Sequence, residues 1–197
     1  FMEFCGLLLG DGNVIDGAST KYVTIARADH ATYMDHYRGV IAREFRGFRG
    51  RGNGRNRAEG ETSPVHLQEG ERQTRFSSVL AVEELKAIGF GGNARTKRVP
   101  GWVFQLPEAH RLAFLRGYLD ADGSVDKMGR MSFSSVGEEM LSQIRHLCIS
   151  CGIPVTNLRN QTGTTTLPNG ERKEFSVWTF TCSDPAANRR VGSHTPE

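Results

Sequence analysis

The chain has 197 residues, which is long enough to bury the core of one large domain or two small ones and excludes disorder throughout. Its formal net charge is +3 and its pI is about 8.8, and its arginines gather in a few stretches, so we expect local basic surfaces that suit a polyanion. No apolar run approaches the roughly 20 residues that cross a bilayer, and we expect a soluble intracellular protein.

Two segments of the chain, Phe4–Gly12 and Leu115–Gly123, repeat one another. Each is apolar, carries small residues four positions apart, and ends in Asp-Gly. A repeat of this kind predicts one domain built from two pseudo-symmetric halves, the first covering about residues 1–100 and the second about residues 101–197.

The segments that follow each repeat predict the same order of elements in both halves. The first half continues with a strand, a helix, a strand and a helix, predicted at Tyr22–Ala26, Asp29–Phe45, Arg75–Leu80 and Val82–Ile88. The second continues with a strand, a helix, two strands about an Asn169-Gly170 hairpin turn and a closing helix, predicted at Met131–Ser135, Val136–Cys151, Ile153–Arg159, Phe175–Thr181 and Asp184–Val191. We interpret each half, its motif helix included, as helix, two strands, helix, two strands, helix, which is an αββαββα order in an α+β fold whose antiparallel sheet has helices on one face.

Polar and apolar side chains alternate along two of these strands, which predicts an open polar face on each sheet. The alternating sets are Gln73, Arg75 and Ser77 against Phe76 and Leu80, and Arg130, Ser132 and Ser134 against Met131 and Phe133. Any half-exposed strand has this pattern, so the alternation alone does not assign a function.

The four cysteines offer little for a metal site. Only Cys148 and Cys151 have a spacing typical of metal ligands, and a structural zinc site needs a second pair. Both lie in an apolar-periodic segment, so we interpret them as buried small hydrophobic residues.

The small residues of the two repeats favour close helix packing. Gly6 and Gly10 in one copy, with Gly117 and Ala121 in the other, give each helix a flat face, and two such faces can bring their backbones close together. Parallel packing would place the two terminal aspartates side by side.

Asp11 and Asp122 would then repel each other at helix ends that already carry partial negative charge. Carboxylates, together with the carbonyl oxygens of Gly10 and Ala121, are hard ligands that suit Mg²⁺, and Mg²⁺ beside a phosphate supports phosphodiester hydrolysis. An EF-hand beginning at Asp120 is excluded, because its sixth and twelfth positions would be Val125 and Met131. A single Asp-Gly that merely ends a helix is common, but two matched copies favour the metal site.

The two segments resemble the dodecapeptide motif of the LAGLIDADG homing endonucleases, and Leu115–Gly123 matches it at most positions. The resemblance extends from Phe4 to about Gly192. It implies a monomer in which the motif helices pair at the interface of two αββαββα halves and saddle-shaped sheets lie in the major groove of double-stranded DNA. It also implies a Mg²⁺-dependent double-strand break at a long, pseudo-palindromic site, with Asp11 and Asp122 as metal ligands.

A second block supports the intein-borne type of this family. Lys97-Arg98-Val99-Pro100 precedes the second motif as a lysine, a hydrophobic residue and a proline do in those members, which implies that Lys97 neutralises charge or positions water at the active site. The alternative is a surface lysine in the basic run Arg95–Arg98. The second half offers no clear counterpart, since Lys173, Arg189 and Arg190 are poor substitutes by position.

Self-splicing requires a nucleophile at the first residue and a terminal His-Asn pair, which Phe1 and Pro196-Glu197 do not supply. We therefore expect the endonuclease portion of an intein, cut from a longer host protein and associated with DNA in the cell.

DNA contacts are expected from the basic, glycine-rich segment Arg43–Arg57 and from the polar strand faces. The candidates are Tyr22, Thr24, Arg46, Arg49, Arg51, Arg75, Ser77, Arg130, Ser132 and Ser134. The basic segment also fits a solvated loop. Two other functions stay open: a DNA- or RNA-binding protein of this fold that does not cleave, which the missing second lysine favours, and a hydrolase of another phosphoester.

Overall fold

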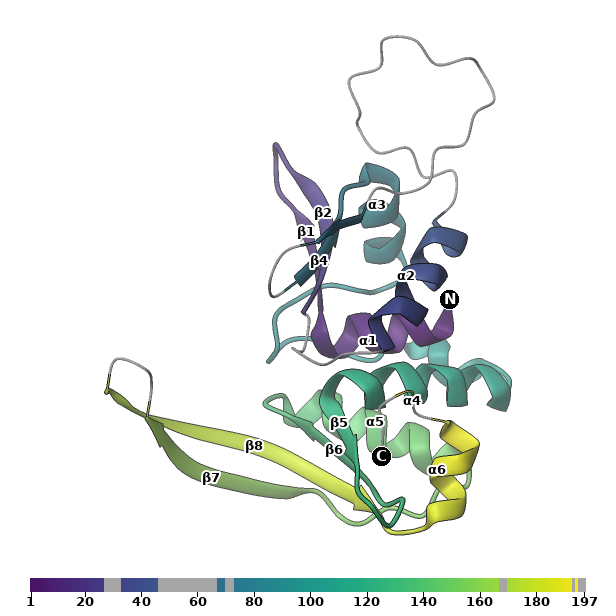
Figure 1. Cartoon of the computed structure of the whole chain (residues 1–197), viewed down its shortest axis with the longest axis vertical. Helices are drawn as coiled ribbons and strands as arrows, with labels where there is room; N and C mark the ends of the chain where they lie inside the picture. Colours follow the sequence, from purple (N-terminus) through teal and green to yellow (C-terminus); the bar gives the residue numbers. More distant parts are fainter. Residues whose placement is uncertain (27–32, 46–66, 70–72, 167–169, 193, 195–197) are drawn as a thin grey trace.

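The computed structural model describes residues 1–26, 33–45, 67–69, 73–166, 170–192 and 194. These residues form six α-helices, one 3-10 helix and eight strands, and Figure 1 shows how they are arranged. The first half contains α1 Met2–Asp11, β1 Gly12–Asp16, β2 Lys21–Ala26, α2 Tyr33–Glu44, β3 Leu67–Glu69, β4 Gln73–Phe76 and α3 Val79–Ala87. After the 3-10 helix Gly101–Gln105, the second half contains α4 Glu108–Asp122, β5 Gly123–Val125, β6 Met131–Ser135, α5 Glu138–Ser150, β7 Arg159–Thr166, β8 Arg172–Cys182 and α6 Pro185–Val191. The expected αββαββα order is therefore confirmed in both halves.

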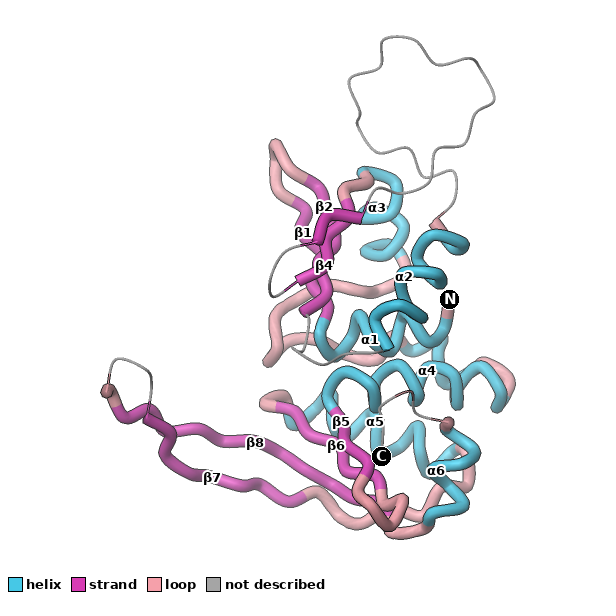
Figure 2. The backbone as a smooth tube through the Cα atoms, in the orientation of Figure 1, coloured by secondary structure: helices cyan, strands magenta, loops and turns pink. Residues whose placement is uncertain are grey.

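Each half contains one four-stranded antiparallel sheet, and the two sheets have equivalent strand orders, β1-β2-β4-β3 and β5-β6-β8-β7. Figure 2 places the helices of each half on one side of its sheet. Val23, Ile25 and Phe76 of the first sheet and Met131 and Phe133 of the second are buried under those helices. The residues between them on β2 and β6 are partly exposed, so the predicted polar faces are present.

Helices α1 and α4 join the two halves along a seam where their backbones touch. A Cβ atom on Gly6 would lie closer than 3.0 Å to the Phe114 carbonyl oxygen, and one on Gly117 would collide in the same way with the Glu3 carbonyl oxygen. Nearer the helix ends, a Cβ on Gly10 would lie 2.5 Å from the Ala121 Cβ. The contacts advance in the same direction along both helices, so the predicted parallel packing is correct and both motif ends reach the same side, as Figure 1 shows.

The strand predicted at Arg75–Leu80 ends early. Strand β4 stops at Phe76, and Ser78 caps α3 by accepting a hydrogen bond from the Ala81 backbone N–H at 3.2 Å. A serine in this position satisfies one of the free N–H groups of a helix start, so the helix begins at Val79, three residues before the prediction. Leu80, expected on the apolar side of the strand, lies instead on the helix and is 49% exposed.

The strand predicted at Ile153–Arg159 is also wrong. Helix α5 ends in a turn in which the Ile153 N–H bonds to the Cys148 carbonyl at 3.0 Å and Gly152 has a φ of +66°. Pro154 follows at once and has no N–H to give to a ladder. The strand β7 therefore begins only at Arg159 and runs to Thr166.

The other helices and strands begin and end nearer to their predicted boundaries. Helix α5 is shorter at its start than the predicted Val136–Cys151, because Gly137 stands at its cap in an extended conformation, and β8 is longer at both ends than Phe175–Thr181. The helix predicted from Asp29 is described from Tyr33, and Asp29 lies outside the described residues, as does Asn169 of the hairpin turn. Gly170 has the positive φ, +84°, that the turn prediction requires.

The four cysteines are free and buried, as expected. Burial raises the pKa of the Cys148 thiol, which keeps it protonated and unreactive. Among the described residues, no helix is long and apolar enough to cross a membrane.

Candidate catalytic centre and nucleic-acid interface

Asp11 and Asp122 are the last residues of α1 and α4 and meet where the two helices end. A Cβ on Gly10 would lie 3.3 Å from the Asp122 carboxylate oxygen, so the carboxyl group of one helix lies against the backbone of the other. The glycine of the first motif therefore leaves room for the aspartate of the second. The structure brings together all four residues that the sequence proposed for this site, Asp11, Asp122, Gly10 and Ala121.

The carboxyl groups of Asp11 and Asp122 lie in surroundings that disfavour their charged forms. Burial, followed by the charge of Asp122, raises the pKa of Asp11 to about 7, and the nearby Lys97 lowers it. Burial also raises the pKa of Asp122, with Lys97 again acting in the opposite direction. A positive ion between the carboxylates would relieve both effects, because it replaces lost hydration and offsets the repulsion.

Lys97 lies at the end of α1 rather than on the surface, which excludes the alternative of a solvated lysine. Its ammonium donates to the carbonyls of Gly12 at 2.6 Å and Gly10 at 2.8 Å, with a longer contact to Leu8 at 3.4 Å. The side chain is 8% exposed. Burial lowers the pKa of Lys97, while Asp122 and Asp11 raise it. The lysine thus places positive charge where a helix end and two carboxylates concentrate negative charge.

The end of α4 in the second half is bonded differently from the end of α1. In the described part of the chain, no lysine or arginine side chain bonds to the carbonyls of Leu119, Ala121 or Gly123, which correspond to the Lys97 acceptors of the first half. Instead the Ser134 hydroxyl donates to the Asp122 carbonyl at 3.1 Å. The sequence placed Ser134 among groove contacts and gave no hint of this bond, since a serine in a strand has many uses.

The raised pKa of Asp11 predicts how the metal-free protein responds to pH. Between about pH 4 and pH 7 the folded chain holds a proton that the unfolded chain has released, so stability falls as the pH rises through this window and levels off above it. The loss is at most about 4 kcal/mol. Urea denaturation at pH 5 and pH 8 with chelator should show a smaller difference in unfolding free energy for Asp11→Asn than for the unchanged protein, and equal differences would contradict the raised pKa of Asp11.

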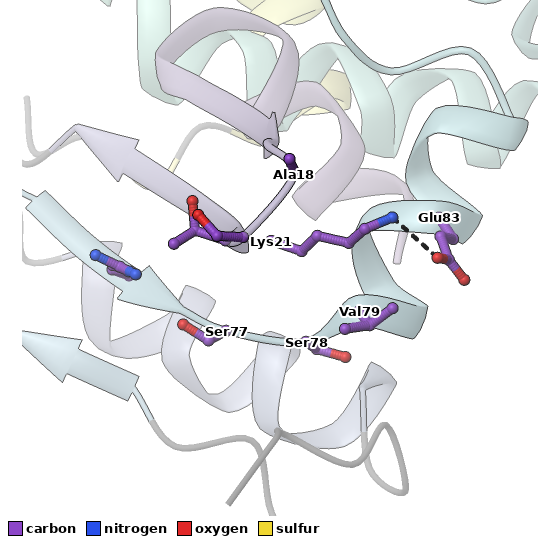
Figure 3. Close-up of a pocket in the computed structure, with 9 residues that line it drawn as sticks. Ala18, Lys21, Ser77, Ser78, Val79 and Glu83 are labelled. Atoms are coloured by element: carbon purple, nitrogen blue, oxygen red, sulfur yellow. Dashed lines mark hydrogen bonds and ion pairs between the residues drawn. The ribbon is translucent and has the colours of Figure 1, made fainter.

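On the first sheet, two of the predicted DNA contacts, Arg75 and Ser77, line one cavity, and Tyr22 and Thr24 lie beside Arg75. The guanidinium of Arg75 lies over the ring of Tyr22, 3.7 Å from its centroid, and its buried Nε has no hydrogen-bond partner in the described structure. Arg75 and Ser77 line an open cavity of about 350 Å³ with Lys21, between the β1–β2 turn and the start of α3 (Figure 3). Lys21 is held there by an ion pair with Glu83 at 3.0 Å (Figure 3). Thr24 is paired with Arg75 across the neighbouring strand.

On the second sheet, one of the predicted DNA contacts already bonds within the protein, and the others lie on the partly exposed face of the sheet. Arg130 bonds through its Nε to Asp126 at 2.6 Å, within the β5–β6 turn, and is therefore partly committed to that turn. Ser132 pairs with Thr181 and Ser134 with Thr179, and all four are partly exposed. A row of hydroxyl groups thus crosses the sheet from β6 to β8.

Strands β7 and β8 form a long hairpin that extends beyond the rest of the second half (Figure 1). Their pairing runs from Arg159↔Thr179 to Thr166↔Arg172, and most of the side chains are exposed. Phe175 near its outer part is 46% exposed. The sequence predicted a hairpin here but not its length. Arg46, Arg49 and Arg51 lie outside the described residues.

The sequence of this chain is similar to parts of several larger proteins. It is 35% identical over 114 residues to an iron-sulfur cluster assembly SufBD family protein of Mycobacterium leprae. It is 36% identical over 89 residues to a DNA polymerase of Thermococcus kodakarensis, and 36% identical over 80 residues to that organism's probable translation initiation factor IF-2. These matches cover 57%, 42% and 40% of this chain but only 13%, 5% and 7% of those proteins, so the chain spans a small part of each relative.

Residues 109–180 match the model of the LAGLIDADG-like domain. In solved structures, the N-terminal LAGLIDADG domain of DUF199/WhiA superposes on 99% of the chain and 81% of its own length, with a TM-score of 0.50 and 11% identity. The homing endonuclease I-WcaI bound to its DNA recognition sequence superposes on 96% of the chain and 78% of its own length, with a TM-score of 0.50 and 13% identity. The second half is thus similar to a LAGLIDADG-like domain over residues 109–180, and the chain as a whole has the fold of the LAGLIDADG proteins on which it superposes.

Proposed function

We propose that this protein is a site-specific DNA endonuclease that makes a metal-dependent double-strand break. The observation that carries the proposal is the pair of half-buried aspartates at the meeting ends of α1 and α4, with the Lys97 ammonium beside them. The I-WcaI structure, a homing endonuclease bound to its DNA recognition sequence, gives a precedent for this activity on the same fold.

The donor set at the helix ends fits Mg²⁺. Asp11 and Asp122 would hold the ions through carboxylate oxygens, which suit a hard cation. The Ala121 carbonyl is close by, whereas the Gly10 carbonyl proposed as a further ligand accepts from the Lys97 ammonium at 2.8 Å. Mg²⁺, when bound, supplies a polarised phosphate and an activated water. The raised pKa of Asp11 fits a site that is completed by positive charge.

Lys97 would contribute its positive charge at the end of α1, in the first half of the site. Its ammonium neutralises the end of α1 and lies near both carboxylates, so it can position a water or offset charge that develops on the phosphate. The sheets would bind the duplex through their polar faces, with Arg75 and Lys21 contacting phosphates and the hydroxyls of β6 and β8 facing base edges.

The context of the chain fits an endonuclease within an intein. The three relatives named above are a SufBD protein, a polymerase and a probable initiation factor, and each is matched over only a small fraction of its length. One inserted element carried by unrelated hosts accounts for this pattern. We propose that the chain acts as a monomer inside such an element, and that its target is long, pseudo-palindromic DNA spanning the insertion point.

The direct test uses a plasmid that carries the uninterrupted host-gene sequence across the insertion point. Incubation with Mg²⁺ should linearise this plasmid and leave unaltered a control plasmid in which the intein gene interrupts the sequence. Chelator should abolish cutting, and sequencing of the ends should give short 3′ overhangs. Tight binding of the target without cutting in any divalent metal would support the second candidate, a binding protein of this fold, which the absence of a described cation at the end of α4 favours.

The difference between the two helix ends predicts a difference between the two DNA strands. Because Lys97 serves only the end of α1 among the described residues, nicked plasmid should accumulate before linear product appears. Lys97→Met should lower the rate of cutting by about 10²-fold. Arg98→Met is the matched control, since the bonds of this neighbouring cation within the described residues go to the carbonyls of Arg95 and Lys97 in its own loop. Equal strand rates in a quenched time course would contradict the asymmetry.

A further inference from the structure

A second cluster of metal-ligand side chains lies at the other end of α1 from Asp11. It consists of Glu3 in the first turn of α1, His36 on α2 and His194 in the segment after α6, and one ligand atom from each lies within 4.8 Å of the others. His36 Nε2 is 2.6 Å from Glu3 Oε2, and the two imidazole rings stack with centroids 4.1 Å apart. All three side chains reach solvent, with exposed fractions of 17%, 39% and 28%.

The outer contacts of this cluster hold the ligands in place. The Asp120 carboxylate accepts from the His194 backbone N–H at 2.9 Å, and its Oδ2 lies 2.9 Å from His194 Nδ1. The Tyr37 hydroxyl donates to the same oxygen at 2.7 Å. A carboxylate on one ring nitrogen directs the other, Nε2, outward as a ligand, which is the usual support of a metal-bound histidine. On the other side, the Arg116 guanidinium pairs with Glu3 Oε1 and leaves Oε2 toward His36.

We infer that Glu3, His36 and His194 bind one divalent transition-metal ion, at a site separate from the Asp11–Asp122 pair. Two imidazoles and one carboxylate suit Zn²⁺, Co²⁺, Ni²⁺ or Cu²⁺, whereas Mg²⁺ favours oxygen ligands alone. Ligands about 2.0 Å from a tetrahedral zinc lie roughly 3.3 Å apart. Glu3 Oε2 and His36 Nε2, now 2.6 Å apart, would therefore move apart by about 0.7 Å, and any pair near the 4.8 Å limit would draw together by about 1.5 Å. Partly exposed side chains on two helices and a chain end allow such a movement, and a water would complete the coordination.

The ion would link three segments that are far apart in the sequence: α1, α2 and the segment after α6. Glu3 and His36 belong to the first half, while His194 follows the last helix of the second half, where Arg116 Nε already donates to the Val191 carbonyl at 2.6 Å. Gly192 ends α6 with a φ of +70° and turns the chain toward α4. The metal would therefore tie the end of the second half to the helices of the first, and this role does not depend on DNA cleavage.

The test measures metal binding by the full 197-residue chain carrying Asp11→Asn and Asp122→Asn, which removes the carboxylate pair as a competing site. Titration with CoCl₂ should give visible absorption that saturates at one ion per chain, and ZnCl₂ should displace it. ZnCl₂ at about 100 times its Kd should raise Tm by about 5–10 °C. Millimolar MgCl₂ should have neither effect.

His36→Gln and His194→Gln should each weaken binding by about 100-fold or more and abolish the Tm shift. His110→Gln and His146→Gln are the matched controls, because these exposed histidines on α4 and α5 are outside the cluster. Circular dichroism and the metal-free Tm identify any variant that fails to fold, and Glu3→Gln then provides a third ligand test. Binding that survives either cluster histidine change, or no binding of Co²⁺ or Zn²⁺ by the parent chain, would overturn the inference.

Discussion

Asp122→Asn is expected to lower DNA cleavage by about 10³-fold or more while target binding persists. Asparagine keeps the size of the side chain but removes the charge that holds the metal, and a catalytic ion is worth several kcal/mol of transition-state stabilisation. Cleavage rates with Mg²⁺ and gel-shift affinities with Ca²⁺ separate the two effects. Asp35→Asn, an exposed aspartate on α2, is the control and should cut normally.

The same change should not weaken the fold. Asp122 is half-buried beside another carboxyl group and its pKa is raised, so loss of its charge relieves repulsion in the metal-free protein. We expect an unchanged or higher Tm with chelator. A variant that melts earlier and loses binding together with cleavage would indicate that Asp122 has a structural role, and the assignment as a metal ligand would then fail.

Gly117→Ala is expected to destabilise the protein by about 3 kcal/mol or more. The new Cβ would overlap the Glu3 carbonyl oxygen, a backbone atom that cannot move unless α1 and α4 separate. Gly39→Ala is the matched control within a helix, since a Cβ there meets nothing within 4 Å. That control should stabilise the protein by about 0.5–1 kcal/mol, because alanine favours helix.

Urea denaturation of both variants measures the difference, and separation of the helices should also move Asp11 away from Asp122. Gly117→Ala should therefore lose DNA cleavage even at temperatures where it remains folded. Two variants of equal stability would contradict the close approach of the helix backbones.

The parts of the fold that the sequence predicted well were those specified by repetition. Two copies of one motif located α1 and α4, their shared direction and the meeting of Asp11 with Asp122, because small residues at matched positions leave few ways to pack. Boundaries that depend on one hydrogen bond were predicted poorly. One hydrogen bond to the Ser78 side chain caps α3, which therefore begins within the segment predicted as a strand. The turn at Gly152 follows α5, and β7 begins only at Arg159.

In the candidate site too, some residues could be predicted from local sequence and others could not. Lys97 was found through a local block of sequence, but its three carbonyl partners depend on how the connector between the halves folds back on α1. Glu3, His36 and His194 had no shared spacing or motif, and only packing of α1, α2 and the chain end brings them together. The partnership of Ser134 with the Asp122 carbonyl likewise required the register of β5 and β6.

Near the end of the segment from Gly89 to Pro100, the spacing between Lys97 and Val99 is fixed by two contacts. On one side Lys97 bonds to the end of α1, and two residues later the Val99 N–H donates to Gln143 of α5 at 2.8 Å. One residue inserted between these anchors would force either the ammonium or the second half out of place, although no sheet or helix would be interrupted. Related chains should therefore vary freely in length at many surface turns and remain constant across Lys97 to Val99.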